Sequence, residues 1–189
     1  MSVVLFGPPG CGKGTQAARL KDALGVPHVS TGDMFRDHLS RKTELGKQVE
    51  ALLAAGKLVP DDVTNSMVEE RLGRPDAAEG VLLDGYPRNV AQAETLDRLL
   101  GARGRAVDVV LAIHVEEDET VRRILKRGQD SGRADDLDEG TIRDRFATYL
   151  EQTEPCLAFY RESGKTVHEI DGIGTIDEIT QRLREALGR

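Results

Sequence analysis

The sequence predicts an α/β fold in which a parallel sheet is covered by helices on both faces. Five short apolar segments recur along the chain, and patterns typical of helices separate them. Strands and helices that alternate in this way form a parallel sheet, because each helix returns the chain to the edge where the next strand begins. The length of 189 residues and the hydrophobic content of 39% suit one domain, over residues 1–189, with a single core.

Local patterns place the individual elements in chain order. The predicted strands are residues 3–6, 26–29, 81–83, 107–115 and 166–170. Residues that favour a helix start precede the helical patterns at Ser30, Thr43, Pro60-Asp61 and Thr175. The helices are expected to end near Gly25, Gly56, Gly128 and Gly164. These positions give the alternation that a parallel sheet requires.

Charge and cysteine content limit the classes of partner. The net charge is −7, which argues against general binding to nucleic acids or membrane surfaces. No segment resembles a signal peptide or a membrane span, so we expect a soluble, cytoplasmic protein. Cys11 and Cys156 lack the spacing of a disulfide framework or a zinc site. No exposed apolar heptad pattern indicates an oligomer, and we expect a monomer.

A glycine-rich loop, GPPGCGKGT at residues 7–15, directly follows the first predicted strand and precedes a helical pattern. Glycines let the backbone turn several N–H groups into one concavity, and Lys13 adds a positive charge at the helix start. The helix N-terminus favours the same anion. The loop therefore predicts phosphate binding, although a turn that binds nothing is the alternative. Gly14 stands where a metal-binding hydroxyl is usual, and Thr15 follows it.

Two segments exceed the minimal alternation of strands and helices. Residues 30–59 place two helical patterns between the second and third strands, and residues 126–136 are polar and mostly charged. Ligands of open parallel sheets bind beyond the carboxyl ends of the strands, so both insertions are candidate covers for a ligand. For residues 126–136, a solvated surface loop is the alternative.

Arginines follow the predicted strand ends and flank the polar segment. Guanidinium groups bind phosphate oxygens in a bidentate manner, and more than one phosphorylated ligand would need several of them. A surface salt bridge is the alternative for any one taken alone. The arginines concerned are Arg36, Arg88, Arg123, Arg127, Arg133 and Arg145.

Asp84 ends the third predicted strand, at the position where phosphate-loop proteins present a carboxylate to magnesium. Because Gly14 supplies no hydroxyl, we expect Asp84 to hold Mg²⁺ through water. A residue of the turn after the strand is the alternative. Cys11 lies inside the loop, where it either fills a small position or acts as a thiol of lowered pKa.

Six motifs in order resemble the adenylate kinase family in its short-lid form: GPPGCGKGTQ, STGDMFR, GKLVPD, LLDGYPRN, KRG and GRADD. The resemblance extends from Val3 to about Gly174. It implies a P-loop NTPase-type sheet of five strands, a segment for the nucleoside monophosphate at 30–59 and a lid at 126–136. The implied reaction converts Mg·ATP and AMP into two ADP. This lid has no cysteine, so the zinc of longer lids is not expected.

The resemblance also implies roles for single residues. Lys13, Arg88, Arg127, Arg133 and Arg145 would be catalytic. ATP would contact Gly10, Cys11, Gly12, Lys13, Gly14, Thr15, Arg123, Arg127 and Gly174. AMP would contact Thr31, Arg36, Lys57, Leu58, Val59, Gly85, Tyr86, Pro87, Arg88, Gln92, Arg133 and Arg145, with Gln92 at the adenine edge. Asp135 and Asp136 match acidic lid positions to which no role is assigned.

Two other functions remain as alternatives. A kinase of the UMP/CMP type shares the loop and a DGYPRN-like segment, although Thr31 resembles the adenine-specific enzymes. A nucleotide-binding switch that transfers nothing would leave Arg36, Arg88 and Gln92 without a purpose. No general base is expected for the transfer, because a phosphate with a second pKa of about 6 is already ionised. The four histidines are therefore expected to be ordinary residues.

Overall fold

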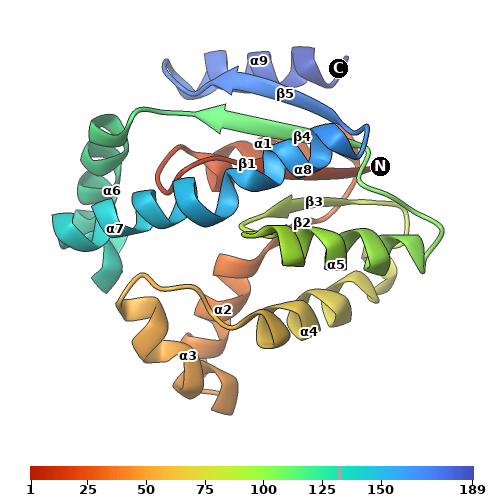
Figure 1. Ribbon diagram of the computed structural model, residues 1–189. Helices are drawn as coiled ribbons and strands as arrows, with labels where there is room; N and C mark the ends of the chain where they lie inside the picture. Colours follow the sequence, from red (N-terminus) through yellow and green to blue (C-terminus); the bar gives the residue numbers. More distant parts are fainter. Residues whose placement is uncertain (132) are drawn as a thin grey trace.

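The computed structural model describes residues 1–131 and 133–189 and confirms the predicted fold class. The described residues form one parallel sheet with the order β2-β3-β1-β4-β5 (Figure 1). The strands are β1 (Ser2–Phe6), β2 (His28–Ser30), β3 (Val81–Asp84), β4 (Val109–His114) and β5 (Thr166–Asp171). Each of the five predicted strands is present, with its ends displaced by no more than two residues.

Alternate residues of the central strand β1 enter two hydrophobic clusters on opposite faces of the sheet. Val4 and Phe6 belong to one cluster, with residues of α4 (Asp61–Leu72), α5 (Val90–Gly101) and α8 (Pro155–Glu162). Val3 and Leu5 belong to the other, with residues of α1 (Lys13–Leu24) and α9 (Ile176–Ala186). All five β1 residues are buried, as expected for a strand covered on both faces.

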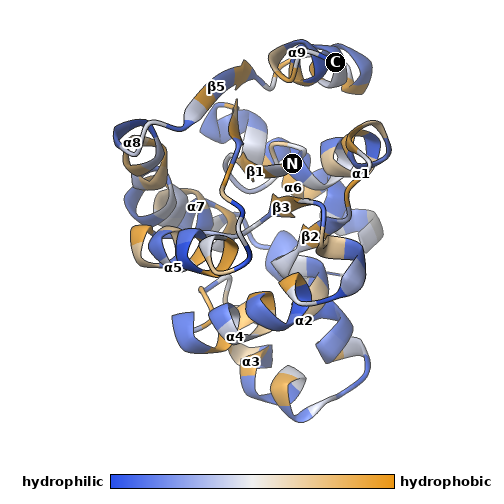
Figure 2. Ribbon diagram, turned by 90° about the vertical axis from the view of Figure 1, so that its right-hand side faces the viewer, coloured by the Kyte–Doolittle hydropathy of each residue, from blue (hydrophilic) through white to orange (hydrophobic). Residues whose placement is uncertain are grey.

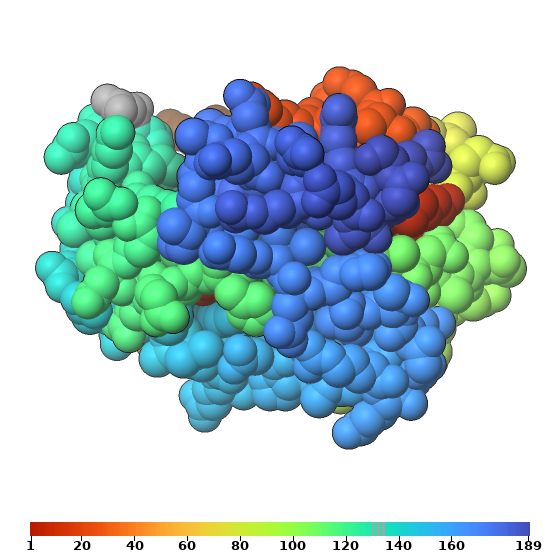
Figure 3. Space-filling view, turned by 90° about the horizontal axis from the view of Figure 1, so that it is seen from above, coloured from red at the N-terminus to blue at the C-terminus, as the bar shows by residue number. Residues whose placement is uncertain are grey.

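Helices cover both faces of the sheet. Figure 2 shows hydrophobic helix positions turned inward on both sides of the strands. Figure 3 shows β5 and α9 forming the surface on one side, between α1 and α8. Among the described residues, no helix is long and apolar enough to cross a membrane.

All four predicted helix starts are confirmed: three by hydrogen bonds at the caps, and the fourth because α4 begins at Asp61 after Pro60, without a side-chain cap. The Ser30 and Thr43 hydroxyls accept from the third residue of α2 (Thr31–Ser40) and α3 (Glu44–Ala54), respectively. Thr175 and Glu178 form a reciprocal capping box at the start of α9. The serine and threonine signals therefore placed these helices correctly.

Residues 30–59 form a small unit beside the sheet. Helices α2 and α3 pack together over a separate cluster made of Phe35, Val49, Val59 and Met67. In Figure 1 this unit lies at the end of the molecule opposite α9. This cluster includes Met67 of α4, so the segment packs against the helix that also contributes Val68 and Leu72 to the sheet core.

The predicted helix end at Gly128 is wrong, because α6 (Glu117–Ser131) continues past it. A Cβ at position 128 would lie 2.6 Å from the carbonyl oxygen of Asp136, so glycine is needed there for close packing rather than for a turn. Asp136 belongs to η2 (Ala134–Asp136), which packs against α6 and α7 (Glu139–Thr148). The segment 126–136 is thus partly helical and folded; Gly132 lies outside the described residues.

Gly46 should be required for packing within the 30–59 unit. A Cβ there would lie 2.3 Å from the His38 carbonyl oxygen, so Gly46→Ala should lower the free energy of unfolding, measured in urea, by about 1–3 kcal/mol. Gly101→Ala is the matched control, because a Cβ at 101 meets nothing within 4 Å. It should leave stability unchanged or raise it by about 0.5 kcal/mol. Equal effects at both positions would contradict this packing argument.

Candidate active site

The glycine-rich loop connects the buried strand β1 to the first turn of α1. Gly7, Gly10 and Gly12 have positive φ, which aims the loop around a concavity. Gly12 is the N-cap of α1 and offers no side-chain cap, so N–H groups of the first turn remain available to an anion. Gly14 lies within α1 and has no positive φ, so it does not contribute to the turn of the loop.

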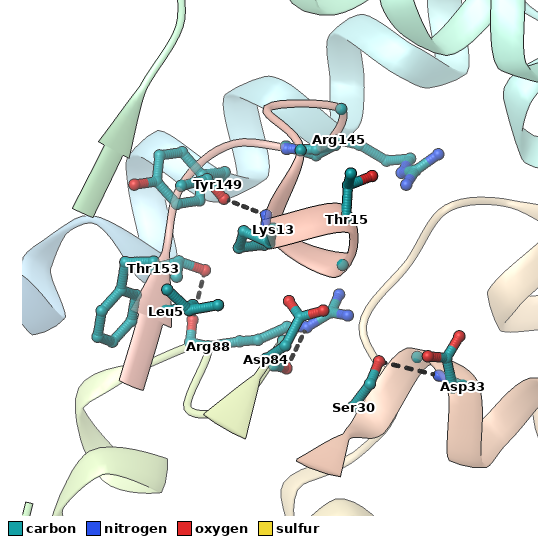
Figure 4. Close-up of a pocket in the computed structure, with 18 of the residues that line it drawn as sticks. Leu5, Lys13, Thr15, Ser30, Asp33, Asp84, Arg88, Arg145, Tyr149 and Thr153 are labelled. Atoms are coloured by element: carbon teal, nitrogen blue, oxygen red, sulfur yellow. Dashed lines mark hydrogen bonds between the residues drawn. The ribbon is translucent and has the colours of Figure 1, made fainter. Parts of the chain in front are cut away.

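Lys13 is the first residue of α1, and its ammonium group turns back over the loop. Its Nζ donates to the carbonyl oxygens of Gly7 at 2.6 Å and Pro8 at 2.9 Å. Figure 4 shows Lys13 between the loop and the side chains that rise from β3 and α7. The positive charge is thus held at the centre of the loop.

The loop forms one wall of a cavity of about 630 Å³. The cavity lies beyond the carboxyl ends of β1 and β3, where ligands of parallel sheets bind. Seven cationic side chains line it, against two carboxylates, although the chain as a whole is acidic. The seven are Lys13, Arg36, Arg88, Arg123, Arg127, Arg133 and Arg145.

Arg88 is held by hydrogen bonds on both its side chain and its backbone. Its Nε donates to the Gly85 carbonyl at 2.8 Å, which also accepts from the Thr31 hydroxyl at 2.7 Å. The Arg88 carbonyl accepts from the Thr153 hydroxyl at 2.8 Å. Burial lowers the pKa of Arg88, and the charges of Arg145 and Arg36 act in the same direction, opposed by Asp84. An arginine nonetheless stays protonated, so this cluster attracts anions.

Asp84 ends β3 and faces the loop from below. A Cβ at Gly14 would lie only 3.7 Å from Asp84 Oδ2, so the carboxylate lies next to the first turn of α1. Burial by itself would raise the pKa of Asp84, but His28, Lys13 and Arg88 outweigh it, and the pKa is lowered. A buried, ionised carboxylate beside a phosphate loop suits a hard cation that prefers oxygen ligands.

His28 was expected to be an ordinary residue, yet it lines this cavity. Its Nε2 lies 3.4 Å from Asp84 Oδ2 without the geometry of a hydrogen bond. The placement follows from the pairing of β2 with β3, which sets Ser30 beside Asp84 and His28 two positions behind. Only the strand order of the sheet could have revealed this neighbour.

Asp136 connects two of the cavity arginines and was missed as a functional residue. Its buried carboxylate accepts from Arg127 Nε at 2.7 Å and Nη2 at 2.8 Å, and from Arg145 Nη1 at 3.2 Å. Arg145 also pairs with the Asp135 carboxylate at 2.8 Å. Burial would raise the pKa of Asp136, but the two arginines outweigh it and lower the pKa. Asp136 therefore fixes the direction of both guanidinium groups.

Two smaller cavities adjoin the main one. A cavity of about 80 Å³ lies between α2, α3 and α5. Eight of the residues predicted to contact AMP line it: Thr31, Arg36, Lys57, Leu58, Val59, Arg88, Gln92 and Arg145. A cavity of about 430 Å³ lies on the other side of the loop. Six of the residues predicted to contact ATP line this cavity of about 430 Å³: Gly10, Cys11, Gly12, Thr15, Arg123 and Gly174.

The remaining predicted residues have different surroundings. Gly85 and Pro87 line the main cavity. The Tyr86 side chain is 1% exposed in the hydrophobic core, and its hydroxyl donates to Asn65 Oδ1 at 2.7 Å. Cys11 is also 1% exposed. Any ligand contact by Tyr86 would therefore come from its backbone.

Comparison with known proteins identifies relatives over nearly the full chain. The family described as adenylate kinase matches residues 5–165. A protein of Thermobifida fusca named adenylate kinase is 52% identical over 187 residues, which cover 99% of this chain and 98% of the relative. Those of Nocardia farcinica and Xanthomonas euvesicatoria, with the same name, are 51% and 47% identical over the whole of both chains.

Loss of the Asp136 charge should destabilise the protein in a pH-dependent way. A lowered pKa stabilises the fold above the ordinary pKa of aspartate, and this contribution is lost as the pH falls through the lowered value. Asp136→Asn should therefore reduce the free energy of unfolding at pH 7 by about 3 kcal/mol. The difference from the unmodified protein should shrink below about pH 4 in urea titrations. Asp144→Asn, an exposed neighbour on α7, is the control; a loss that is independent of pH would exclude this role for the Asp136 charge.

Proposed function

The chain belongs to the adenylate kinase family, and from this premise we propose how its cavities carry out the reaction of that family. The reaction is the reversible transfer of the terminal phosphoryl group of ATP to AMP, which gives two ADP. One observation carries the proposal: seven cationic side chains line a single cavity beside the phosphate loop. Two nucleotides that meet end to end bring several negative charges into one place, and these cations balance them.

The three cavities suggest separate places for the two nucleotides. The phosphates of ATP lie along the loop and the first turn of α1, and its base lies in the cavity between Arg123 and Gly174. AMP lies in the cavity of the 30–59 unit, with its phosphate toward Arg36 and Arg88. The phosphoryl group then passes across the main cavity, which touches both spaces. All the cations come from one chain, so a monomer suffices for the reaction.

The transfer needs positioning and charge stabilisation more than proton transfer. The attacking group is an oxygen of the AMP phosphate, whose second pKa of about 6 leaves it largely ionised at neutral pH. Lys13 Nζ donates to two carbonyl oxygens of the loop. When ATP binds, its phosphate oxygens replace these carbonyls as acceptors, and the ammonium group lies beside the transferred phosphoryl group. Arg127 and Arg145 present their remaining N–H groups to the phosphates, because Asp136 holds them from behind. These groups stabilise the charge that spreads over the transferred group.

Asp84 is the residue that would help to hold Mg²⁺. It is buried, its pKa is lowered, and it faces Gly14 in the loop. No cluster of three or more His, Cys, Asp or Glu side chains occurs among residues 1–131 and 133–189, so most ligands would be water and phosphate oxygens. The ion would neutralise part of the charge on the ATP phosphates.

Residues 126–136 act as a lid and residues 30–59 as the AMP-binding unit. The two already meet, because η2 of the lid contacts α3. A Cβ at Gly56 would also lie 2.7 Å from Cδ of Arg145, which belongs to α7, just after the lid. Arg145 thus connects three parts: it belongs to α7, it pairs with Asp135 and Asp136 of the lid, and it packs against Gly56 of the AMP-binding unit. When both parts approach further around two nucleotides, water is excluded as a competing acceptor.

The Lys13 charge should be essential for turnover. Lys13→Met should lower kcat for ADP formation from Mg·ATP and AMP about a hundredfold, because about 3 kcal/mol of charge stabilisation is lost. Lys21→Met on the exposed face of α1 is the matched control and should retain kcat within about twofold. AMP, UMP, CMP and GMP are compared as acceptors in the same assay. Normal turnover by a folded Lys13→Met variant, or preference for UMP or CMP, would contradict the proposal.

Removal of the Asp84 charge should weaken the response to magnesium. Asp84→Asn should raise the Mg²⁺ concentration for half-maximal rate by about tenfold or more at fixed ATP, as for other groups that bind a metal through water. Asp37→Asn, which removes an exposed aspartate of α2, is the control. An unchanged Mg²⁺ dependence in Asp84→Asn would exclude Asp84 from the metal site.

A further inference from the structure

We propose that Asp61 is a positioning residue that sets the direction of the Gln92 side-chain amide, and so makes the small cavity selective for a 6-aminopurine over a 6-oxopurine. The inference rests on the proposed function, in which this cavity holds the base of AMP. Gln92 lines the cavity and is 2% exposed, so its amide has no access to bulk water. Its orientation is decided by its protein neighbours.

Both ends of the Gln92 amide are bound to groups that cannot exchange roles. Its Oε1 accepts from the backbone N–H of Arg88 at 2.8 Å, and its Nε2 donates to Asp61 Oδ1 at 2.7 Å. A backbone N–H can only donate, and a carboxylate can only accept. A rotation of the amide by 180° would therefore replace two hydrogen bonds with two repulsive contacts.

Asp61 is itself fixed at the start of α4. Its two oxygens accept from Asn89 Nδ2 at 3.1 Å each, and Asn89 also caps α5 by accepting from the backbone N–H of Gln92 at 2.8 Å. The first turn of a helix favours a negative side chain. Asp61, Asn89 and Gln92 thus form one network between α4 and α5.

The fixed amide leaves a defined pattern for a ligand. In the part of the chain that the structure describes, the Gln92 side chain has only these two partners, so one hydrogen on Nε2 and one lone pair on Oε1 remain unused. A 6-aminopurine has an acceptor at N1 and a donor at its amino group, which match this pair. A 6-oxopurine has a donor at N1 and an acceptor at O6, and it would need the amide rotated. A buried site rejects a ligand whose polar groups stay unpaired.

The network also ties base recognition to the phosphate. The N–H that holds Gln92 belongs to Arg88, whose guanidinium lines the same cavity. A change in the amide direction would therefore disturb the backbone that carries a phosphate-binding arginine. The groups that bind the base and the phosphate of one nucleotide are therefore held at a fixed position relative to each other.

The test compares AMP with IMP, which differ at N1 and at the group on C6. Binding of each nucleotide is measured by calorimetry, and kcat/KM by ADP or IDP formation, for the unmodified protein and for Asp61→Asn. The AMP-to-IMP ratio should fall about tenfold in Asp61→Asn, which corresponds to about 1.4 kcal/mol. Asp62→Asn is the matched control, because it removes an exposed charge from the same helix turn and should keep the ratio within twofold. Asp61→Ser gives the same comparison if Asp61→Asn does not fold.

A second variant separates positioning from a general structural effect. In a Gln92→Ala background, Asp61→Asn should no longer change the ratio, because the amide that it orients is gone. If Asp61→Asn lost affinity for AMP and IMP equally, so that the ratio did not change, the inference about Asp61 would be overturned. The proposed function would not be affected. If the ratio of the AMP and IMP affinities fell in Asp61→Asn but the unmodified protein formed no ADP, the inference would be supported and the proposed function rejected.

Discussion

Mutual repulsion among the cations of the main cavity is the constraint around which the rest of the site is arranged. Burial lowers the pKa of Arg88 and of Arg133, and neighbouring arginines act in the same direction: Arg145 and Arg36 on Arg88, and Arg36 and Arg127 on Arg133. Part of this repulsion is offset by carboxylates that bind arginines on the side away from the cavity. Asp136 does this for Arg127 and Arg145. The charge that remains unbalanced faces the cavity, where phosphates can supply the missing negative partner.

Close packing, more than flexibility, explains several of the glycines. Gly128 admits the Asp136 carbonyl against α6, and Gly56 admits the Arg145 side chain against the AMP-binding unit. Both contacts lie beside arginines that line the cavity, because Asp136 binds Arg127 and Arg145 itself packs against Gly56. The two segments that the proposed mechanism moves are therefore also segments in which glycines allow close approach of neighbouring groups. Small changes of their packing would redirect the cations.

A common principle connects the carboxylates that the sequence left without a role. Asp136 orients two guanidinium groups, and Asp61 orients an amide. Neither needs to touch a ligand to affect its binding, because each limits the directions in which a buried donor can point. The ligand then meets groups that are already aligned, and less ordering is needed when it binds.

The sequence by itself determined the alternation of strands and helices, the phosphate loop and the helix caps at Ser30, Thr43 and Thr175. These features depend on periodicity and on contacts between residues a few positions apart, which a sequence displays directly. Only the tertiary structure decided that His28 faces Asp84, that α6 continues past Gly128, and that Asp61 holds Gln92. Those partners are separated along the chain, and strand order and helix packing alone set their distance and direction.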